Sequence, residues 1–199
     1  MTPAPIILAS GSAIRRDILT GAGIDFEVDS RPVDEAAIKA AMRDAGATPR
    51  DIADALAEAK ALRVSRQRPG LVIGADQVMV MDGQLFDKPA DREEARRRLQ
   101  IMRGRRHELI GGLVVAQDGV PVWRHLSETR LWVREFSDDF LDHYLDLEGE
   151  AVTHSVGAYR FEGLGAQLFS KVEGDFFSIL GLSLLPLLDY LRTRGAIPA

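Results

Sequence analysis

The chain has 199 residues, a formal net charge of −5 at pH 7, and 46% hydrophobic and 28% charged residues. This length allows one domain, or two closely packed lobes, with a sizeable core. The acidic balance argues against a general affinity for nucleic acid or for an anionic membrane. The absence of cysteine excludes disulfides and thiolate chemistry. With no signal peptide and no apolar run near the ~18 residues of a membrane span, we expect a soluble cytoplasmic protein.

The first segment has the features of a phosphate-binding turn. A short apolar run over residues 5–9 leads into Ser10-Gly11-Ser12, and helical spacing of apolar residues follows over 13–20. Backbone N–H groups and the helix dipole attract an anion at such a helix N-terminus, for which Ser12 is the expected N-cap. Arg15 and Arg16 in the first turn are well placed for the same anion. The alternative is two solvated arginines beside an ordinary cap.

A short strand over 26–28 and a long alanine-rich helical region over 35–67 come next. Asp34-Glu35 has the position of first-turn acids, and Thr48-Pro49 predicts a new helix start within the region. The expected apolar stripe of this second helix comprises Ile52, Ala55, Leu56, Ala59 and Leu62. Lys60 would ordinarily lie on the surface.

The stretch from Val72 to Pro89 contains the most unusual residue. It predicts a buried strand to Met81, a tight turn at Asp82-Gly83, and a short second strand that ends at Lys88-Pro89. Asp76 lies within the apolar strand, where an unpaired carboxylate would be costly to bury. Lys88 offers the opposite charge across the hairpin. Asp76 is therefore either a core carboxylate paired with an arginine or a backbone N–H, or a catalytic acid.

The remaining segments indicate an α/β protein. A helix is expected from Asp91 to about Met102, and its basic cluster over 96–106 follows Glu93 and Glu94, which favours i,i+4 pairing on a solvated face. Two long strands, 107–117 and 120–135, flank Asp118-Gly119, and further helices begin near Ser137 and after Ser183. Between these two helices the chain is punctuated by glycines. The four histidines lack the spacing of a zinc site.

Together these segments resemble the Maf family of nucleoside triphosphate pyrophosphatases over nearly the whole chain. The matching motifs occur in the order typical of the family: Leu8–Ser12 with Arg15, Asp34-Glu35, Ala59-Lys60-Ala61, Gly74–Gln77, Lys88-Pro89, Gly157–Tyr159, Glu162–Gly165 and Glu173-Gly174.

The resemblance implies a fold, an activity and partners. The fold is α/β of the Maf/ITPase-like type: one domain over residues 1–199, with a long mixed central sheet, flanking helices and two lobes around a deep cleft, often as a homodimer. The activity is hydrolysis of a nucleoside triphosphate between the α and β phosphorus atoms, with Mg²⁺ or Mn²⁺ as the divalent metal. The expected partner is a small-molecule nucleotide, with no nucleic acid and no membrane.

The resemblance also assigns site residues. Asp76 matches the catalytic carboxylate of the family, and with Glu35 it can hold the metal or take the proton of the attacking water. Lys88 completes the expected catalytic set. The expected substrate-binding residues are Ser10, Gly11, Ser12, Arg15, Arg16, Lys60, Gln77 and Glu162, of which Arg15 and Lys60, with Lys88, would clamp the triphosphate.

The subfamily is left open by mixed features. Ile14, Gln77 and Glu162 are closer to the 7-methyl-GTP type, whereas Gly157-Ala158-Tyr159 is closer to the thymidine/uridine triphosphate type. Glu162 is the main candidate for base recognition, because a carboxylate can accept hydrogen bonds from the N1–H and amine of guanine. Two alternatives are a dTTP/UTP pyrophosphatase and a non-catalytic nucleotide-binding regulator of septum formation. A nucleic-acid-binding role for the 96–106 cluster fits the acidic total poorly.

Overall fold

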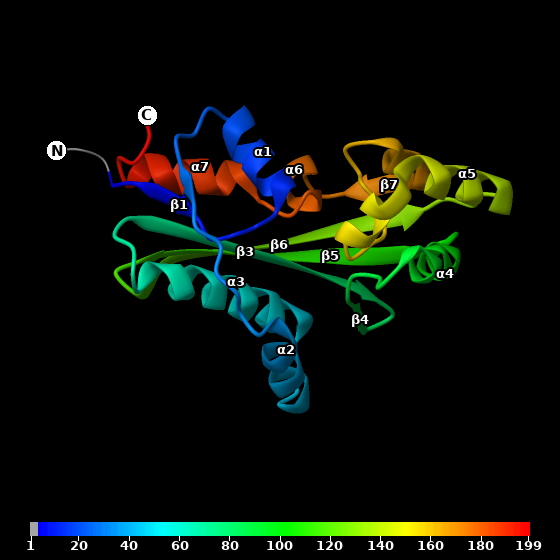
Figure 1. Cartoon of the computed structure of the whole chain (residues 1–199), viewed down its shortest axis with the longest axis horizontal. Helices are drawn as coiled ribbons and strands as arrows, with labels where there is room; N and C mark the ends of the chain where they lie inside the picture. Colours follow the sequence, from blue (N-terminus) through cyan, green and yellow to red (C-terminus); the bar gives the residue numbers. More distant parts are fainter. Residues whose placement is uncertain (1–3) are drawn as a thin grey trace. The chain divides into compact units, whose positions relative to one another are not determined.

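A computed structural model describes residues 4–199 of the chain (Figure 1). They divide into two compact units. The first unit comprises the residues up to 77 together with 110–127 and 175–199, and the second comprises 78–109 and 128–174. No helix among the described residues has the length and apolar character needed to cross a membrane.

Helices and strands alternate through most of the described chain. The strands are β1 (Ile6–Leu8), β2 (Glu27–Val28), β3 (Leu71–Met81), β4 (Gln84–Phe86), β5 (Arg106–Gln117), β6 (Val120–Val133) and β7 (Phe169–Glu173). The α-helices are α1 (Ala13–Gly21), α2 (Glu35–Asp44), α3 (Pro49–Ser65), α4 (Arg92–Met102), α5 (Asp138–Glu148), α6 (Phe176–Ile179) and α7 (Leu184–Thr193). Two 3₁₀ helices are η1 (Gly149–His154) and η2 (Leu164–Leu168).

The strands form one mixed sheet in the order β2-β1-β3-β5-β6-β7, with β4 paired to β3. β1 pairs in parallel with β2 and β3, whereas β3–β4 and β6–β7 are antiparallel. Both predicted tight turns are confirmed. Asp82 and Gly83 have φ of 50° and 78°, and Asp118 and Gly119 have φ of 52° and 75°, as a type I′ turn requires. The expected mixed α/β class is therefore confirmed.

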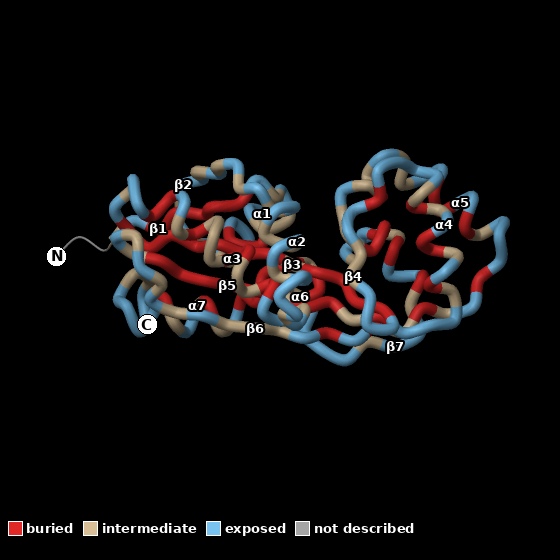
Figure 2. Tube along the Cα trace, turned by 90° about the horizontal axis from the view of Figure 1, so that it is seen from below, coloured by how far each residue is buried: buried red, intermediate tan, exposed pale blue. Residues whose placement is uncertain are grey.

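The first unit has helices on both faces of its strands, and its inner strands β1 and β3 are buried on both sides (Figures 1 and 2). Because side chains alternate along a strand, neighbouring residues enter different cores. Leu71, Ile73 and Ala75 pack with residues of α1 and α7. Val72 instead packs with Val64 of α3. This alternation decides which face of β3 carries each polar residue.

Helix α3 contacts two strands through glycine. A Cβ at Gly74 of β3 would lie 2.2 Å from Ala57 O and 2.8 Å from the Cβ of Ala61, and one at Gly112 of β5 would lie 2.3 Å from Ala53 O. The three alanines recur every fourth residue and are fully buried. Small side chains on the helix therefore face glycines, which have no side chain, on the strands. The helix backbone lies against the sheet as a result.

This contact corrects the predicted apolar stripe of α3. Ile52 and Leu56 are buried as expected, but Ala55, Ala59 and Leu62 are only half-buried. The buried set is instead Ile52, Ala53, Leu56, Ala57, Ala61, Val64 and Ser65. Spacing within the helix could not reveal that the strand glycines draw Ala53, Ala57 and Ala61 inward.

The second unit packs α4 against neighbours through Ala95, Leu99 and Met102, which are fully buried as predicted. The basic cluster of this helix is partly solvated as expected, with an i,i+4 ion pair of 2.6 Å between Arg97 and Glu93. Arg98 departs from that expectation.

The Arg98 side chain is 7% exposed, and it contacts Asp87 O as well as two further groups. Its Nη2 lies 2.9 Å from a carboxylate oxygen of Glu94, and its Nη1 donates to Val156 O at 2.7 Å. Arg98 therefore joins α4 to the segment after η1, and the cluster is not wholly a solvated face.

The glycine-punctuated region contains a strand that the sequence analysis did not predict. β7 pairs antiparallel with β6, with Arg130 opposite Glu173 and Leu131 opposite Val172. Gly174, directly after the strand, has φ of 139°, and a Cβ there would lie 2.6 Å from the hydroxyl of Thr129 on β6. Glycine is thus needed where β7 leaves its partner.

A buried aromatic cluster explains the Gly157-Ala158-Tyr159 motif. A Cβ at Gly157 would lie 2.2 Å from the Tyr159 ring, and the Tyr159 hydroxyl lies 2.7 Å from Nε2 of His107 on β5. Tyr159 also makes an edge contact with Phe169 at a centroid distance of 4.8 Å. His107 is 1% exposed, and its Nδ1 has no hydrogen-bond partner among the described residues.

His107 should make the protein sensitive to acid. Burial lowers the pKa of His107 from 6.5 to about 3, so between these values the unfolded chain binds a proton that the folded chain does not. This contribution to stability is present above pH 6.5 and is lost as the pH falls, with a slope approaching about 1.4 kcal/mol per pH unit. His107→Gln should flatten the free energy of unfolding between pH 4 and 6, measured by urea denaturation. His143→Gln, at an exposed site on α5, is the control, and an unchanged slope in His107→Gln would contradict this account.

Candidate active site in the first unit

Asp76 lies on the face of β3 that is turned towards α3. It is two residues beyond Gly74 and four beyond Val72, so the strand alternation places all three on one side. Asp76 is 6% exposed. Lys60 of α3 follows Ala59 and precedes Ala61, which abuts Gly74, and its Nζ donates to Asp76 Oδ1 at 2.5 Å.

A second carboxylate meets the same ammonium group. Glu35 is in the first turn of α2, whose N-cap Asp34 accepts a hydrogen bond of 2.9 Å from the Ala37 N–H. Glu35 Oε1 lies 2.8 Å from Lys60 Nζ. The Lys60 side chain is 15% exposed and bridges carboxylates from two different elements.

The partner of Asp76 differs from the two partners expected for a core carboxylate. Asp76 is a buried, paired carboxylate, but its partner is Lys60 rather than an arginine or a backbone N–H. Lys60, expected to be on the surface by helix spacing alone, is half-buried instead. The alanine repeat of α3 and Gly74 of β3 indicate this contact only once the two elements are known to pack together.

The Ser10-Gly11-Ser12 turn joins β1 to the N-terminus of α1. Ser10 is buried, and its Oγ accepts hydrogen bonds from the Ser12 N–H at 3.3 Å and from Arg15 Nη1 at 3.0 Å. Ser12 occupies the N-cap position as predicted, yet its hydroxyl makes no capping hydrogen bond. Gly11 and Arg16 are exposed.

Arg15 points into the unit rather than into solvent. Its Nη1 donates to Ala75 O at 2.9 Å, and its Nε donates to Gly181 O at 2.9 Å. Burial lowers the pKa of the Arg15 guanidinium, and the charges of Asp76 and Glu35 act in the opposite direction. Arg15 therefore lies in the electrostatic field of both candidate carboxylates.

Gln77 follows Asp76 and reaches the segment around α6. Its Nε2 donates to Ser178 O at 2.8 Å and to Ile179 O at 3.3 Å. With both contacts made by the amide nitrogen, the carbonyl oxygen of Gln77 is left to accept hydrogen bonds from elsewhere.

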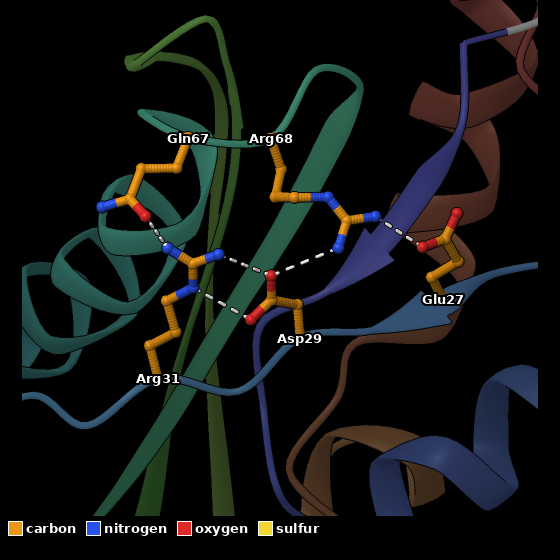
Figure 3. A network of polar contacts seen from close by, with 5 residues as sticks. All are labelled: Glu27, Asp29, Arg31, Gln67 and Arg68. Carbon is orange, nitrogen blue, oxygen red and sulfur yellow. Dashed lines mark hydrogen bonds and ion pairs between the residues drawn. The ribbon is translucent and has the colours of Figure 1, made fainter.

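A polar network holds the connection that leads to Asp34 and Glu35 (Figure 3). Asp29 lies between two arginines: Arg31 donates to both its oxygens at 3.0 and 2.9 Å, and Arg68 Nη1 donates at 3.3 Å. Arg68 also pairs with Glu27 of β2 at 2.5 Å, and Arg31 contacts Gln67. The hydrogen bonds from Arg31, first among several causes, hold the pKa of Asp29 below its usual value. The network joins the start of this connection to the turn after α3.

The two remaining predicted residues belong to the second unit. Lys88 is exposed in the segment after β4. Glu162 accepts a hydrogen bond from Arg160 Nε at 3.2 Å, in a turn where a Cβ at Gly165 would lie 2.4 Å from Arg160 O. Gly165 therefore lets the chain pack closely against the backbone of Arg160.

The donor set suits a hard divalent cation. No group of three or more histidine, cysteine, aspartate or glutamate side chains that could hold a metal occurs among residues 4–199. Asp76 and Glu35 nevertheless already converge on one cationic group, the Lys60 ammonium. Mg²⁺ is commonly held by one or two carboxylates together with substrate phosphates and waters. Two oxygen donors of this kind therefore fit Mg²⁺ or Mn²⁺ delivered with a phosphate ligand.

The first unit thus combines groups that suit phosphate chemistry. Two carboxylates can orient and deprotonate a water or bind a metal, and a lysine between them can neutralise phosphate charge. Near them, the Ser10-Gly11-Ser12 turn presents backbone N–H groups at a helix N-terminus.

The comparisons with known proteins agree with this chemistry. A family model described as Maf-like protein matches residues 5–194. A nucleoside triphosphate pyrophosphatase of Caulobacter vibrioides is 53% identical over 197 residues, covering 99% of each chain. Another, of Maricaulis maris, is 54% identical over 192 residues, covering 96% of this chain and 97% of its own. A 7-methyl-GTP pyrophosphatase of Mesorhizobium japonicum is 49% identical over 193 residues, again covering 96% and 97%. The chain belongs to the Maf-like protein family.

Proposed function

We propose that this protein is a nucleoside triphosphate pyrophosphatase that removes modified or non-canonical nucleotides, with 7-methyl-GTP as the leading candidate substrate. The observation that carries the proposal is the pair of carboxylates, Asp76 and Glu35, that share the Lys60 ammonium. Relatives that align over almost the whole chain are nucleoside triphosphate pyrophosphatases, and one is a 7-methyl-GTP pyrophosphatase.

The reaction requires a water to attack the α-phosphorus in line with the bond to the α–β bridging oxygen. Asp76 takes a proton from that water as the new P–O bond forms. The bond to the bridging oxygen breaks, and pyrophosphate leaves with the electron pair. The products are a nucleoside monophosphate and pyrophosphate.

Cations and N–H groups of the chain would stabilise the charge that spreads over the phosphate oxygens. Lys60 can move from the two carboxylates to the phosphates as a flexible point charge, and we assign Lys88 to the same task. The Gly11 N–H can hold a phosphate at the α1 N-terminus, the Ser12 N–H can join it by leaving Ser10 Oγ, and Arg16 is exposed beside them. Such electrostatic positioning is commonly the largest single catalytic contribution, about 3–4 kcal/mol for one donor.

Asp76 and Glu35 would hold the proposed divalent metal. When bound, the metal would neutralise phosphate charge and polarise the α-phosphoryl group. Lys60 balances the same two carboxylates before the metal arrives.

We assign base recognition to Glu162, and Gln77 stays a predicted substrate-binding residue. A carboxylate at position 162 can accept hydrogen bonds from the N1–H and exocyclic amine of guanine, and the Gln77 carbonyl oxygen is oriented by the two contacts of its amide nitrogen. A preference for dTTP and UTP is the competing assignment, from the Gly157-Ala158-Tyr159 motif. The homodimer, the cytoplasmic location and the two-lobed single domain stay predictions.

Asp76→Asn tests the reaction. It keeps the shape of the side chain but removes its charge and basicity, so turnover should fall by about 10²–10⁴-fold. Pyrophosphate release would be measured with Mg²⁺ and a panel of 7-methyl-GTP, GTP, dTTP and UTP. Asp82→Asn, in an exposed turn where asparagine tolerates positive φ, is the matched control. Release of orthophosphate alone would refute the proposal, and nucleotide binding without turnover in the wild type would favour the regulator of septum formation.

Lys60→Met tests whether Lys60 competes with the metal for the carboxylates of Asp76 and Glu35. Opposite charges at this range attract by about 4 kcal/mol at an effective dielectric constant of 20, so removing the ammonium should strengthen metal binding. We expect nucleotide-free Lys60→Met to bind Mn²⁺ at least about tenfold more tightly (~1.4 kcal/mol) than the wild type, by electron paramagnetic resonance titration. Turnover should fall in the same variant.

Lys171→Met, on strand β7 of the second unit, is the control for a lost lysine and should bind Mn²⁺ like the wild type. Weaker Mn²⁺ binding in Lys60→Met would show that Lys60 supports the metal site instead of competing for it.

Glu162→Gln tests base recognition. Loss of one bidentate acceptor costs about 1–3 kcal/mol of discrimination, so the ratio of kcat/KM for 7-methyl-GTP over UTP should fall by roughly 5- to 150-fold. Glu150→Gln, at an exposed position of the same unit, should leave the ratio unchanged. An unaltered ratio in Glu162→Gln would remove Glu162 from base recognition.

A further inference from the structure

The guanidinium of Arg15 makes hydrogen bonds within the protein. Arg15 was expected to clamp the triphosphate, but its Nη1 donates to Ser10 Oγ and Ala75 O, and its Nε donates to Gly181 O. Three of its five N–H donors are thus directed at acceptors from three segments of the chain. All three contacts lie within the first unit.

Through Ala75, these contacts bear on the position of Asp76. Ala75 directly precedes Asp76 in β3, and Gln77 directly follows it. Arg15 ties Ala75 O to Gly181 O, and the Gln77 side chain is tied to Ser178 O and Ile179 O. Both neighbours of Asp76 are therefore linked to the same short segment, Ser178–Gly181.

The backbone conformation of Gly181 and its lack of a side chain permit the contact with Arg15. Its φ is 92°, and a Cβ there would lie 3.3 Å from Arg15 Nη2 and 3.5 Å from Nε. The absence of a side chain lets the guanidinium lie against the backbone at the point where Nε reaches Gly181 O. A larger residue would move either the arginine or the turn.

We infer that Arg15 is a positioning residue, which, together with Ser178–Gly181, fixes the backbone of β3 on either side of Asp76. The inference rests on the proposed function, since it takes Asp76 as the reacting carboxylate. A planar guanidinium can join a hydroxyl and two carbonyl groups in fixed directions, whereas the single ammonium of lysine cannot reproduce that fork. The phosphate is left to Lys60 and to the Gly11 N–H of the Ser10-Gly11-Ser12 turn.

The first test separates positioning from clamping. In Arg15→Met, a positioning role predicts a fall in kcat of about 10²-fold, the usual cost of misplacing a reacting group by 1 Å, with KM changed by less than about threefold. Affinity for an α,β-methylene triphosphate, measured by calorimetry, should likewise be retained. Arg15→Lys should not restore kcat. A raised KM, weakened analogue binding and partial rescue by lysine would overturn the inference and restore the clamp.

The second test disturbs the contact without changing any charge. Gly181→Ala should lower kcat without raising KM, and combining it with Arg15→Met should cost little more than Arg15→Met alone, because both remove one linkage. Gly195→Ala is the matched control: Gly195 also has positive φ, 63°, but a Cβ there meets nothing within 4 Å. Additive losses, or equal effects of the two alanines, would refute the inference.

A readout independent of turnover keeps this inference separate from the proposed function. Hydrogen exchange at the amides of residues 75–77 should accelerate in Arg15→Met and Gly181→Ala and be unchanged in Gly195→Ala, with thermal denaturation checking that each variant is folded. If the wild type releases no pyrophosphate, the proposed function fails whatever the exchange shows. If exchange at these amides is unaltered, the positioning role fails even in an active enzyme.

Discussion

At Gly74, helix α3 lies so close to β3 that no side chain fits between them. The close approach brings Lys60 to Asp76, which would be costly to bury without a partner. With Glu35 and Arg15, the site contains two carboxylates and two cationic side chains, whose formal charges cancel. A triphosphate adds several negative charges to this balanced set. That imbalance is the physical reason for the proposed metal to arrive with the nucleotide rather than before it.

Local signals in the sequence were sufficient for much of the fold. Asp-Gly pairs predicted both tight turns because positive φ is a property of the turn itself. Helix starts at Thr48, Asp91 and Ser137 were likewise confirmed, each side chain accepting a hydrogen bond from the N–H three residues on. These features depend on residues a few positions apart. Strand β7 was not predicted, because its pairing depends on β6, some forty residues earlier.

The candidate site was only partly predictable for the same reason. Sequence reasoning selected Asp76, Glu35, Lys60 and Arg15, and the structure gathers all four in the first unit. It could not reveal that Lys60 bridges the two acids, since α2, α3 and β3 are separate in sequence. Nor could it reveal that the Arg15 donors are used by backbone carbonyls. Residue type indicated the chemistry, whereas long-range contacts decided which group each residue serves.

The strands at the two ends of the main strand order, β2 and β7, are short and charged. Glu27 of β2 is held by Arg68, and Lys171 and Glu173 of β7 pair with each other at 2.6 Å. Charged, short edge strands are poor templates for another chain. Strand addition at these two edges is therefore disfavoured, and with it amyloid-like stacking through them, even though the inner strands of the sheet are strongly apolar.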